Sequence, residues 1–164
     1  MPNAQFEIHL GSNEELDSNG SDDLSFLFSA NKGSEPKELG KGASGGELSR
    51  VMLALKSVLS SHKQLPTLIF DEIDTGVSGD IAIKMGGILK EMGKTMQLIS
   101  ITHLPQIAGQ GASHFKVYKK DTKEKTQTFI EALDTEQRIS EIAGMLGGSQ
   151  ESSAAIEHAK NLLK

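Results

Sequence analysis

Two stretches of the sequence end in side chains that can bind a metal ion or move a proton. The apolar run 68–70 is followed at once by the carboxylates Asp71 and Glu72, and the run 98–101 is followed two residues on by His103. An aspartate is a hard oxygen ligand that suits Mg²⁺, a neighbouring glutamate can orient or deprotonate a water, and a histidine can hydrogen-bond a phosphate or that water. These residue types suit the magnesium-dependent transfer of a phosphoryl group to water.

A glycine-rich segment supplies a candidate anion site. The chain has four glycines and no large apolar residue between Gly40 and Gly46. An amphipathic helix then begins, so the N–H groups of Gly45 and Gly46, the Ser44 hydroxyl and the helix dipole can hold a phosphate. An alternative is a plain turn in which Ser44 is only the N-cap. The apolar face expected on this helix is Leu48, Val51, Met52, Leu55, Val58 and Leu59.

The elements that position these side chains follow from the hydrophobic pattern. Short continuous apolar runs are typical of strands buried on both faces of a parallel sheet, and we expect such strands to begin at Pro66 and Gln97. An amphipathic helix over 81–92 separates them, so the crossover is parallel. Open α/β sheets bind ligands at the carboxyl ends of such strands. The sequence therefore predicts an α/β fold with a mainly parallel core sheet flanked by helices and some antiparallel strands.

The hydrophobic pattern also predicts the secondary structure of the other segments. Alternating apolar residues predict half-buried strands over 6–10 and 24–28, separated by a mobile polar loop over 11–23. Gly86-Gly87 should weaken their helix by roughly 1–2 kcal/mol relative to alanines, and close packing against a neighbour would explain them. The remaining expected segments are a linker over 31–42, helices over 45–61, 104–108, 138–146 and 151–163, and a lysine-rich hairpin over 115–130.

Composition limits the class of protein. The chain has 164 residues, a formal net charge of −5 and no cysteine, which predicts a cytoplasmic globular protein without disulfides or thiolate metal sites. No apolar run reaches the roughly 18–20 residues of a membrane span, so we expect no membrane partner. The negative charge argues against a broad DNA-binding surface on this chain. The lysines of the hairpin are interpreted as a solvated tip, with a loop that touches DNA as the alternative.

Three motifs, in order, resemble those of ABC-type ATPases. Residues 43–50 resemble the signature motif, residues 68–72 the Walker B strand, and His103 the switch histidine. The amino-acid sequences of these motifs are similar to those of the RecN family of bacterial DNA repair proteins, relatives of the SMC proteins. This similarity runs from about residue 1 to about residue 148. The resemblance implies the C-terminal lobe of an ABC-type P-loop NTPase head, with ATP and Mg²⁺ as cofactors, acting in double-strand-break repair.

The resemblance also implies a role for each site residue. Asp71 would bind Mg²⁺, and Glu72 and His103 would be catalytic within their own subunit. Four signature residues would bind the ATP of the opposing subunit of a head-to-head homodimer. These residues are Ser44, Gly45, Gly46 and Glu47.

The chain departs from the family pattern because it contains no Gly-x-x-x-x-Gly-Lys-Ser/Thr motif. We therefore expect 1–164 to be a single domain that is the C-terminal part of a longer protein. Its parts would be strands and linker over 1–42, the motif region over 43–148 and a last helix over 149–164. We expect it to hydrolyse ATP only together with its own N-terminal lobe, and to meet DNA, in a nucleoid-associated setting, through the complete protein.

Other interpretations stay open. One alternative function is an interaction or dimerisation module that hydrolyses nothing because it lacks its own P-loop. Another is a metal-dependent hydrolase that uses Asp71, Glu72, Asp74 and His103. Asp74 could support the residues that bind magnesium, or it could cap the following turn. Arg50 could contact the ligand, or it could pair with Glu47.

Overall fold

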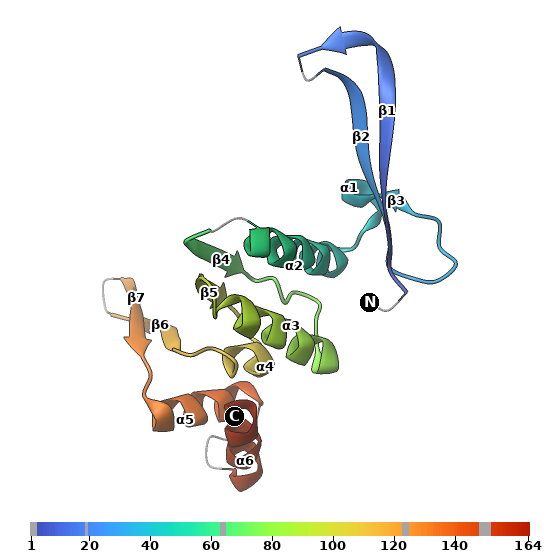
Figure 1. Ribbon diagram of the computed structural model, residues 1–164. Coiled ribbons are helices and arrows are strands. Elements are labelled where there is room, and N and C mark those ends of the chain that lie inside the picture. The colour runs from blue at the N-terminus through green and yellow to red at the C-terminus, as the bar shows by residue number, and fades with distance from the viewer. Residues whose placement is uncertain (1–2, 19, 63–64, 123–124, 148–151) are drawn as a thin grey trace. The chain divides into compact units, whose positions relative to one another are not determined.

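The computed structural model describes residues 3–18, 20–62, 65–122, 125–147 and 152–164. The chain divides into two compact units, 1–56 and 57–164, and each is described by itself (Figure 1). That 1–164 acts as a single domain stays a prediction.

Unit 1 is built on an antiparallel hairpin. Strand β1 (Gln5–Asp17) pairs with β2 (Gly20–Ser29), and β2 pairs with the short β3 (Lys37–Glu38). The rings of Phe6 and Phe26 stand 5.9 Å apart across the hairpin. The prediction of a mobile loop over 11–23 is wrong for its described residues, because Ser12 pairs with Asp22 and, after a register shift, Asp17 pairs with Gly20. Residue 19 of this predicted loop lies outside the described residues. Side-chain polarity does not prevent a ladder whose hydrogen bonds are made by the main chain.

The helices of unit 1 carry the glycine-rich segment. Helix α1 (Leu39–Gly42) lies in the expected linker, and α2 (Gly45–His62) begins where the sequence predicts. The last turns of α2, from residue 57 on, belong to unit 2. The expected apolar face of α2 is covered only in part, since Val51 is buried but Val58 is 61% exposed. Leu53, outside that face, is 2% exposed. Periodicity therefore identifies an apolar face without showing what covers it.

Unit 2 contains the predicted parallel pair. Strands β4 (Thr67–Asp71) and β5 (Gln97–Ile101) run parallel and in register, joined through α3 (Gly79–Met92). One face of β4 is buried at Leu68 and Phe70, whereas Ile69 on the opposite face is 64% exposed. The prediction that both faces are buried is therefore wrong for this chain, because an apolar run specifies a hydrophobic face but not its partner.

The rest of unit 2 is a hairpin and three helices. Helices α5 (Thr135–Met145) and α6 (Ser153–Leu162) pack through Ile142, Ala143 and Ala159, which are fully buried. The prediction of close packing at Gly86-Gly87 is confirmed at Gly86, where a Cβ would lie 3.0 Å from the main-chain oxygen of Gln106, but Gly87 faces open space. The elements are α4 (Pro105–Ala108), β6 (Phe115–Asp121), β7 (Thr126–Ala132), α5 (Thr135–Met145) and α6 (Ser153–Leu162).

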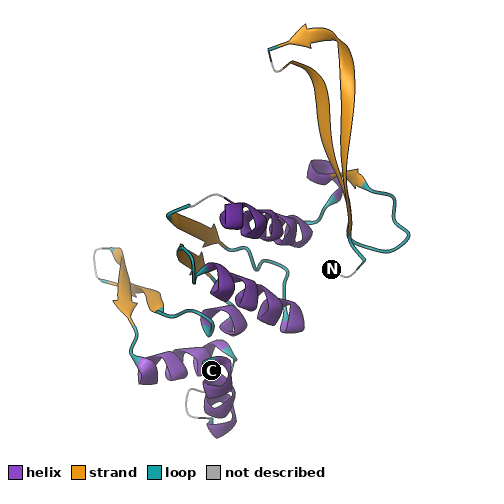
Figure 2. Cartoon of the chain, in the orientation of Figure 1, coloured by secondary structure: helices purple, strands orange, loops and turns teal. Residues whose placement is uncertain are grey.

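The predicted α/β class is confirmed. Within the described residues the parallel portion is the β4–β5 pair, while the other pairings are antiparallel (Figure 2). None of the described helices has the length and apolar character needed to cross a membrane.

Candidate active site

The structure brings Asp71, Glu72 and His103 to one end of the β4–β5 pair. Asp71, the last residue of β4, lies opposite Ile101, the last residue of β5. The N–H of Glu72 donates to the carbonyl of Ile101 at 3.2 Å, and His103 follows two residues later. All three polar residues are exposed. The side chains that the sequence selected therefore lie at the accessible carboxyl ends of these two strands, called the β4–β5 edge below.

Glu72 has an unusual backbone conformation. Its φ is +48°, and it is the only non-glycine residue with positive φ in the described ranges. Its carbonyl accepts from both the N–H and the hydroxyl of Thr75, at 3.3 and 3.0 Å. The left-handed region costs a non-glycine residue about 1–3 kcal/mol and persists where the surroundings enforce it, commonly at functional sites. At Glu72 the backbone thus leaves the extended course of β4 and enters the turn.

Asp74 links the turn after β4 to the turn after β5. Its side chain is fully buried, and one carboxylate oxygen, Oδ2, accepts from the hydroxyl of Thr102. The Thr102 oxygen in turn accepts from the N–H of Leu104 at 3.0 Å. Nδ1 of His103 lies 3.8 Å from the other oxygen, Oδ1. Thr102 was not singled out from the sequence, and the available signal was a hydroxyl residue directly before the candidate histidine.

Ser44 and Glu47 form a capping box at the start of α2. The carboxylate of Glu47 accepts from the main-chain N–H of Ser44 at 2.8 Å and from its hydroxyl at 2.7 Å. The hydroxyl oxygen accepts from the N–H of Glu47 at 3.4 Å. The hydroxyl, and after it the N–H of Ser44, lower the pKa of Glu47 below its ordinary value. The N-cap interpretation of Ser44 therefore has direct structural support.

A binding role for this motif is compatible with the cap. The first helical hydrogen bond of α2 runs from the N–H of Leu48 to the carbonyl of Ser44, at 2.9 Å. The N–H groups of Gly45 and Gly46 precede it and have no intrahelical acceptor. Ser44 and Gly45 are exposed, so an anion can reach them. Nucleotide binding by Ser44, Gly45, Gly46 and Glu47 stays a prediction.

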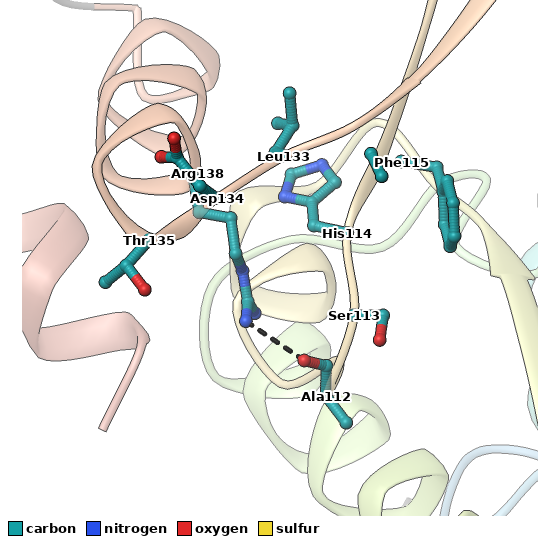
Figure 3. A pocket seen from close by; sticks show the side chains of 9 residues that line it. Ala112, Ser113, His114, Phe115, Leu133, Asp134, Thr135 and Arg138 are labelled. Carbon is teal, nitrogen blue, oxygen red and sulfur yellow. Dashed lines mark hydrogen bonds between the residues drawn. The ribbon is translucent and has the colours of Figure 1, made fainter.

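The two arginines differ in their contacts. Arg138 donates to the carbonyls of Gly111 and Ala112, at 2.6 and 3.2 Å, and so fastens the loop before β6 (Figure 3). Arg50 has a buried Nε without a hydrogen-bond partner, and no ion pair joins it to Glu47 in the part of the chain that the structure describes. The choice between its two interpretations stays open.

A pocket of about 330 Å³ lies beside Arg138 and His114, and none of the predicted site residues lines it (Figure 3). Burial lowers the pKa of His114 below its usual range, and the neighbouring guanidinium of Arg138 lowers it further. Its Nδ1 is buried without a partner. This environment keeps His114 neutral, as suits a structural histidine.

The residues at the β4–β5 edge fit Mg²⁺ only as part of a shared site. Among the described residues no group of three or more histidines, aspartates or glutamates could hold a metal ion. Magnesium in phosphoryl-transfer sites is held by one or two carboxylates together with phosphate oxygens and waters. One exposed aspartate at a strand end, Asp71, meets that requirement when a nucleotide supplies the other ligands.

Comparison with solved structures defines the class of fold. A chain from work on ATP-driven dimerization and DNA-stimulated activation of SMC ATPases matches with a TM-score of 0.60, at 20% identity, over 90% of this chain and 84% of that one. An Smc head domain with coiled coil and joint from Pyrococcus yayanosii matches with a TM-score of 0.66, at 20% identity, over 99% of this chain and 26% of that one. The chain has the α/β fold of an SMC-type ATPase head.

Sequence comparison is more specific. The chain is 39% identical to DNA repair protein RecN of Haemophilus influenzae, over 99% of this chain and 29% of the relative. It is 42% identical to RecN of Vibrio cholerae, over 99% of this chain and 30% of the relative. No family model matches. The predicted resemblance to RecN is confirmed, and the chain spans about three tenths of the length of the curated relatives it matches.

Proposed function

We propose that this chain is one lobe of a RecN-like ATPase head that acts in the repair of DNA double-strand breaks. It supplies the carboxylates and the histidine of one ATP site and the signature motif of another. Its own N-terminal lobe completes the first site. The second site belongs to a second copy of the protein bound head to head, and the signature motif of this chain completes it. A cytoplasmic, nucleoid-associated location follows from that role.

One observation carries the proposal: Asp71, Glu72 and His103 occupy one exposed end of two parallel strands that pair in register. A metal ligand, a base and a hydrogen-bonding imidazole are groups that can promote hydrolysis of a phosphoanhydride. The positive φ of Glu72 supports the assignment, because such strain is kept where the carboxylate direction matters. The likeness of fold to SMC ATPases, whose dimerization is described as ATP-driven, supports ATP as the substrate.

Each residue has a separate task in this mechanism. Asp71 would hold Mg²⁺, which when bound neutralises charge on the phosphates. Glu72 orients the attacking water and accepts its proton. His103 hydrogen-bonds that water or a γ-phosphate oxygen, close to where charge develops.

The signature motif would act on the opposing subunit. The N–H groups of Gly45 and Gly46 and the hydroxyl of Ser44 are donors that can surround a γ-phosphate at the positive end of α2. ATP-driven dimerization is described for the SMC ATPases of similar fold, which supports a dimer held through nucleotide. With a net charge of −5, this chain would meet DNA through the complete protein.

The test is Glu72→Gln in the complete ATPase. We expect a loss of kcat of about 100-fold or more, the usual contribution of a general base, with ATP binding retained and the dimer persisting. Glu91→Gln is the matched control, because Glu91 is an exposed residue of α3 whose partner is Lys94. Steady-state hydrolysis, nucleotide titration and gel filtration measure the three properties.

Two outcomes would contradict the proposal. Unchanged turnover in Glu72→Gln would remove Glu72 as the base. A complete protein that binds ATP but never hydrolyses it would favour the alternative function, an interaction module without hydrolysis.

A further inference from the structure

Asp74 carries a buried oxygen that its own environment does not satisfy. The side chain is 0% exposed. Oδ2 accepts from the hydroxyl of Thr102, but Oδ1 has no hydrogen-bond donor. Buried polar atoms are nearly always paired, and leaving a carboxylate oxygen unpaired is costly. A group that can approach Oδ1 is therefore expected.

The imidazole of His103 is such a group. Its Nδ1 lies 3.8 Å from Oδ1, somewhat beyond hydrogen-bond length. The side chain of His103 is 67% exposed, so the ring can turn with little obstruction. A small rotation that shortens this distance to about 3 Å would make the hydrogen bond.

The other contacts of Asp74 leave Oδ1 without a donor. The turn after β4 is closed by the N–H of Val77, which donates to the main-chain carbonyl of Asp74 at 3.0 Å. The carboxylate takes no part in that bond. Its hydroxyl partner, Thr102, is the residue directly before His103 and is held by the N–H of Leu104. The carboxylate is thus anchored beside the histidine and is not the acceptor of the bond that closes the turn.

We propose that Asp74 is a positioning residue for His103, accepting a hydrogen bond from Nδ1–H so that Nε2 faces the ligand. The consequence for hydrolysis rests on the proposed function. With the ring neutral, Nε2 keeps its lone pair and accepts a hydrogen bond from the water. An aspartate that holds a histidine tautomer in this way is a known device in catalytic triads.

The first experiment reads the tautomer without any nucleotide. In the 164-residue chain labelled with ¹⁵N-histidine, at about pH 8 where free imidazole is neutral, we expect Nδ1 of His103 to carry the proton. Loss of its signals in His103→Asn gives the assignment. Asp74→Asn should transfer the preference to Nε2–H, because the amide can present a donor to Nδ1. Asp80→Asn, the same change at an exposed residue of α3, should leave the tautomer unaltered.

The second experiment measures hydrolysis in the complete ATPase. Asp74→Asn should lower kcat tenfold or more while KM for ATP stays within about threefold, and Asp80→Asn should change neither. Circular dichroism and thermal unfolding establish that both variants are folded.

The outcomes separate this inference from the proposed function. An Nε2–H tautomer in the unaltered chain, or one that Asp74→Asn leaves in place, overturns the positioning role whatever the hydrolysis results. The same holds if kcat is unaffected by Asp74→Asn while His103→Asn lowers it. If the tautomer behaves as expected but His103→Asn leaves hydrolysis intact, the positioning contact stands and the proposed role of His103 falls.

Discussion

The Ser44–Glu47 motif and the β4–β5 edge are held in different ways. Ser44 and Glu47 satisfy each other three residues apart, at the start of one helix and in contact with solvent. The carboxylate of Asp74 is buried and depends on Thr102, which is 28 residues away on the turn after the next strand. The first arrangement needs only local sequence, whereas the second exists only once β4 and β5 have paired.

This difference has an energetic consequence. An exposed capping box exchanges its hydrogen bonds with water, so its net contribution is modest. A buried carboxylate cannot recruit water when its partner is lost, so removal of one donor leaves the full desolvation cost. Unit 2 should therefore be more sensitive than unit 1 to the loss of one hydroxyl.

Thr102→Val tests the sensitive side of the comparison. The change keeps the shape of the side chain but removes the donor to Asp74 and the acceptor for the N–H of Leu104. We expect a loss of about 1–3 kcal/mol in the free energy of unfolding, the cost of an unsatisfied buried polar group. Urea denaturation followed by circular dichroism measures it.

Thr67→Val is the matched control on the same strand pair. The hydroxyl of Thr67 donates to the side-chain oxygen of Gln97 at 2.8 Å, but both groups are exposed. The expected change is within about 0.5 kcal/mol. Equal losses in the two variants would mean that burial of Asp74 does not set the cost.

Ser44→Ala tests the local side. Loss of an N-cap hydroxyl typically costs about 1 kcal/mol, so the effect should be smaller than that of Thr102→Val. The pKa of Glu47 should also rise toward its ordinary value, because the hydroxyl of Ser44 is the largest cause of its depression. Thermal unfolding and NMR titration of the Glu47 carboxyl measure the two effects.

Ser49→Ala is the control on α2. The hydroxyl of Ser49 donates to the carbonyl of Gly45 at 3.0 Å, a contact inside the helix that adds little stability. We expect no loss, and a pKa of Glu47 as in the unaltered chain. A loss as large as that of Ser44→Ala would contradict the capping explanation.

Local features of the fold were predictable from the sequence. The start of α2, the β4–β5 pair and the gathering of Asp71, Glu72 and His103 at one end follow from glycine, hydrophobic periodicity and the rule for parallel strands. What failed was the extent of the first hairpin and the burial of the apolar faces. The pairing of Gly11, Ser12 and Asp17 with the second strand was missed because main-chain ladders leave little trace in polar side chains.

Burial, contacts between side chains on different turns, and backbone strain were also hard to infer from the sequence. Ile69 belongs to an apolar run but is 64% exposed, since pattern alone cannot specify what covers a face. The contact between Asp74 and Thr102 joins two turns, and no spacing rule relates residues on different strands before their register is known. The strain at Glu72 is also a property of the folded turn, not of its residue type.

Acid should destabilise the two units in different pH ranges, and this effect should be smaller than those of Thr102→Val and Ser44→Ala. Burial and Arg138 lower the pKa of His114 in unit 2 below its usual 6.5, so the unfolded chain binds a proton there before the folded chain does. Stability of unit 2 therefore falls as the pH drops below about 6.5. The lowered pKa of Glu47 in unit 1 acts only below its ordinary 4.5, where stability is lost as the carboxylate is protonated.

Hydrogen exchange between pH 7.5 and 5.5 should thus show loss of protection in unit 2 alone. His114→Gln should flatten that slope while the exposed control His158→Gln keeps it, and an unchanged slope in His114→Gln would assign the acid sensitivity elsewhere.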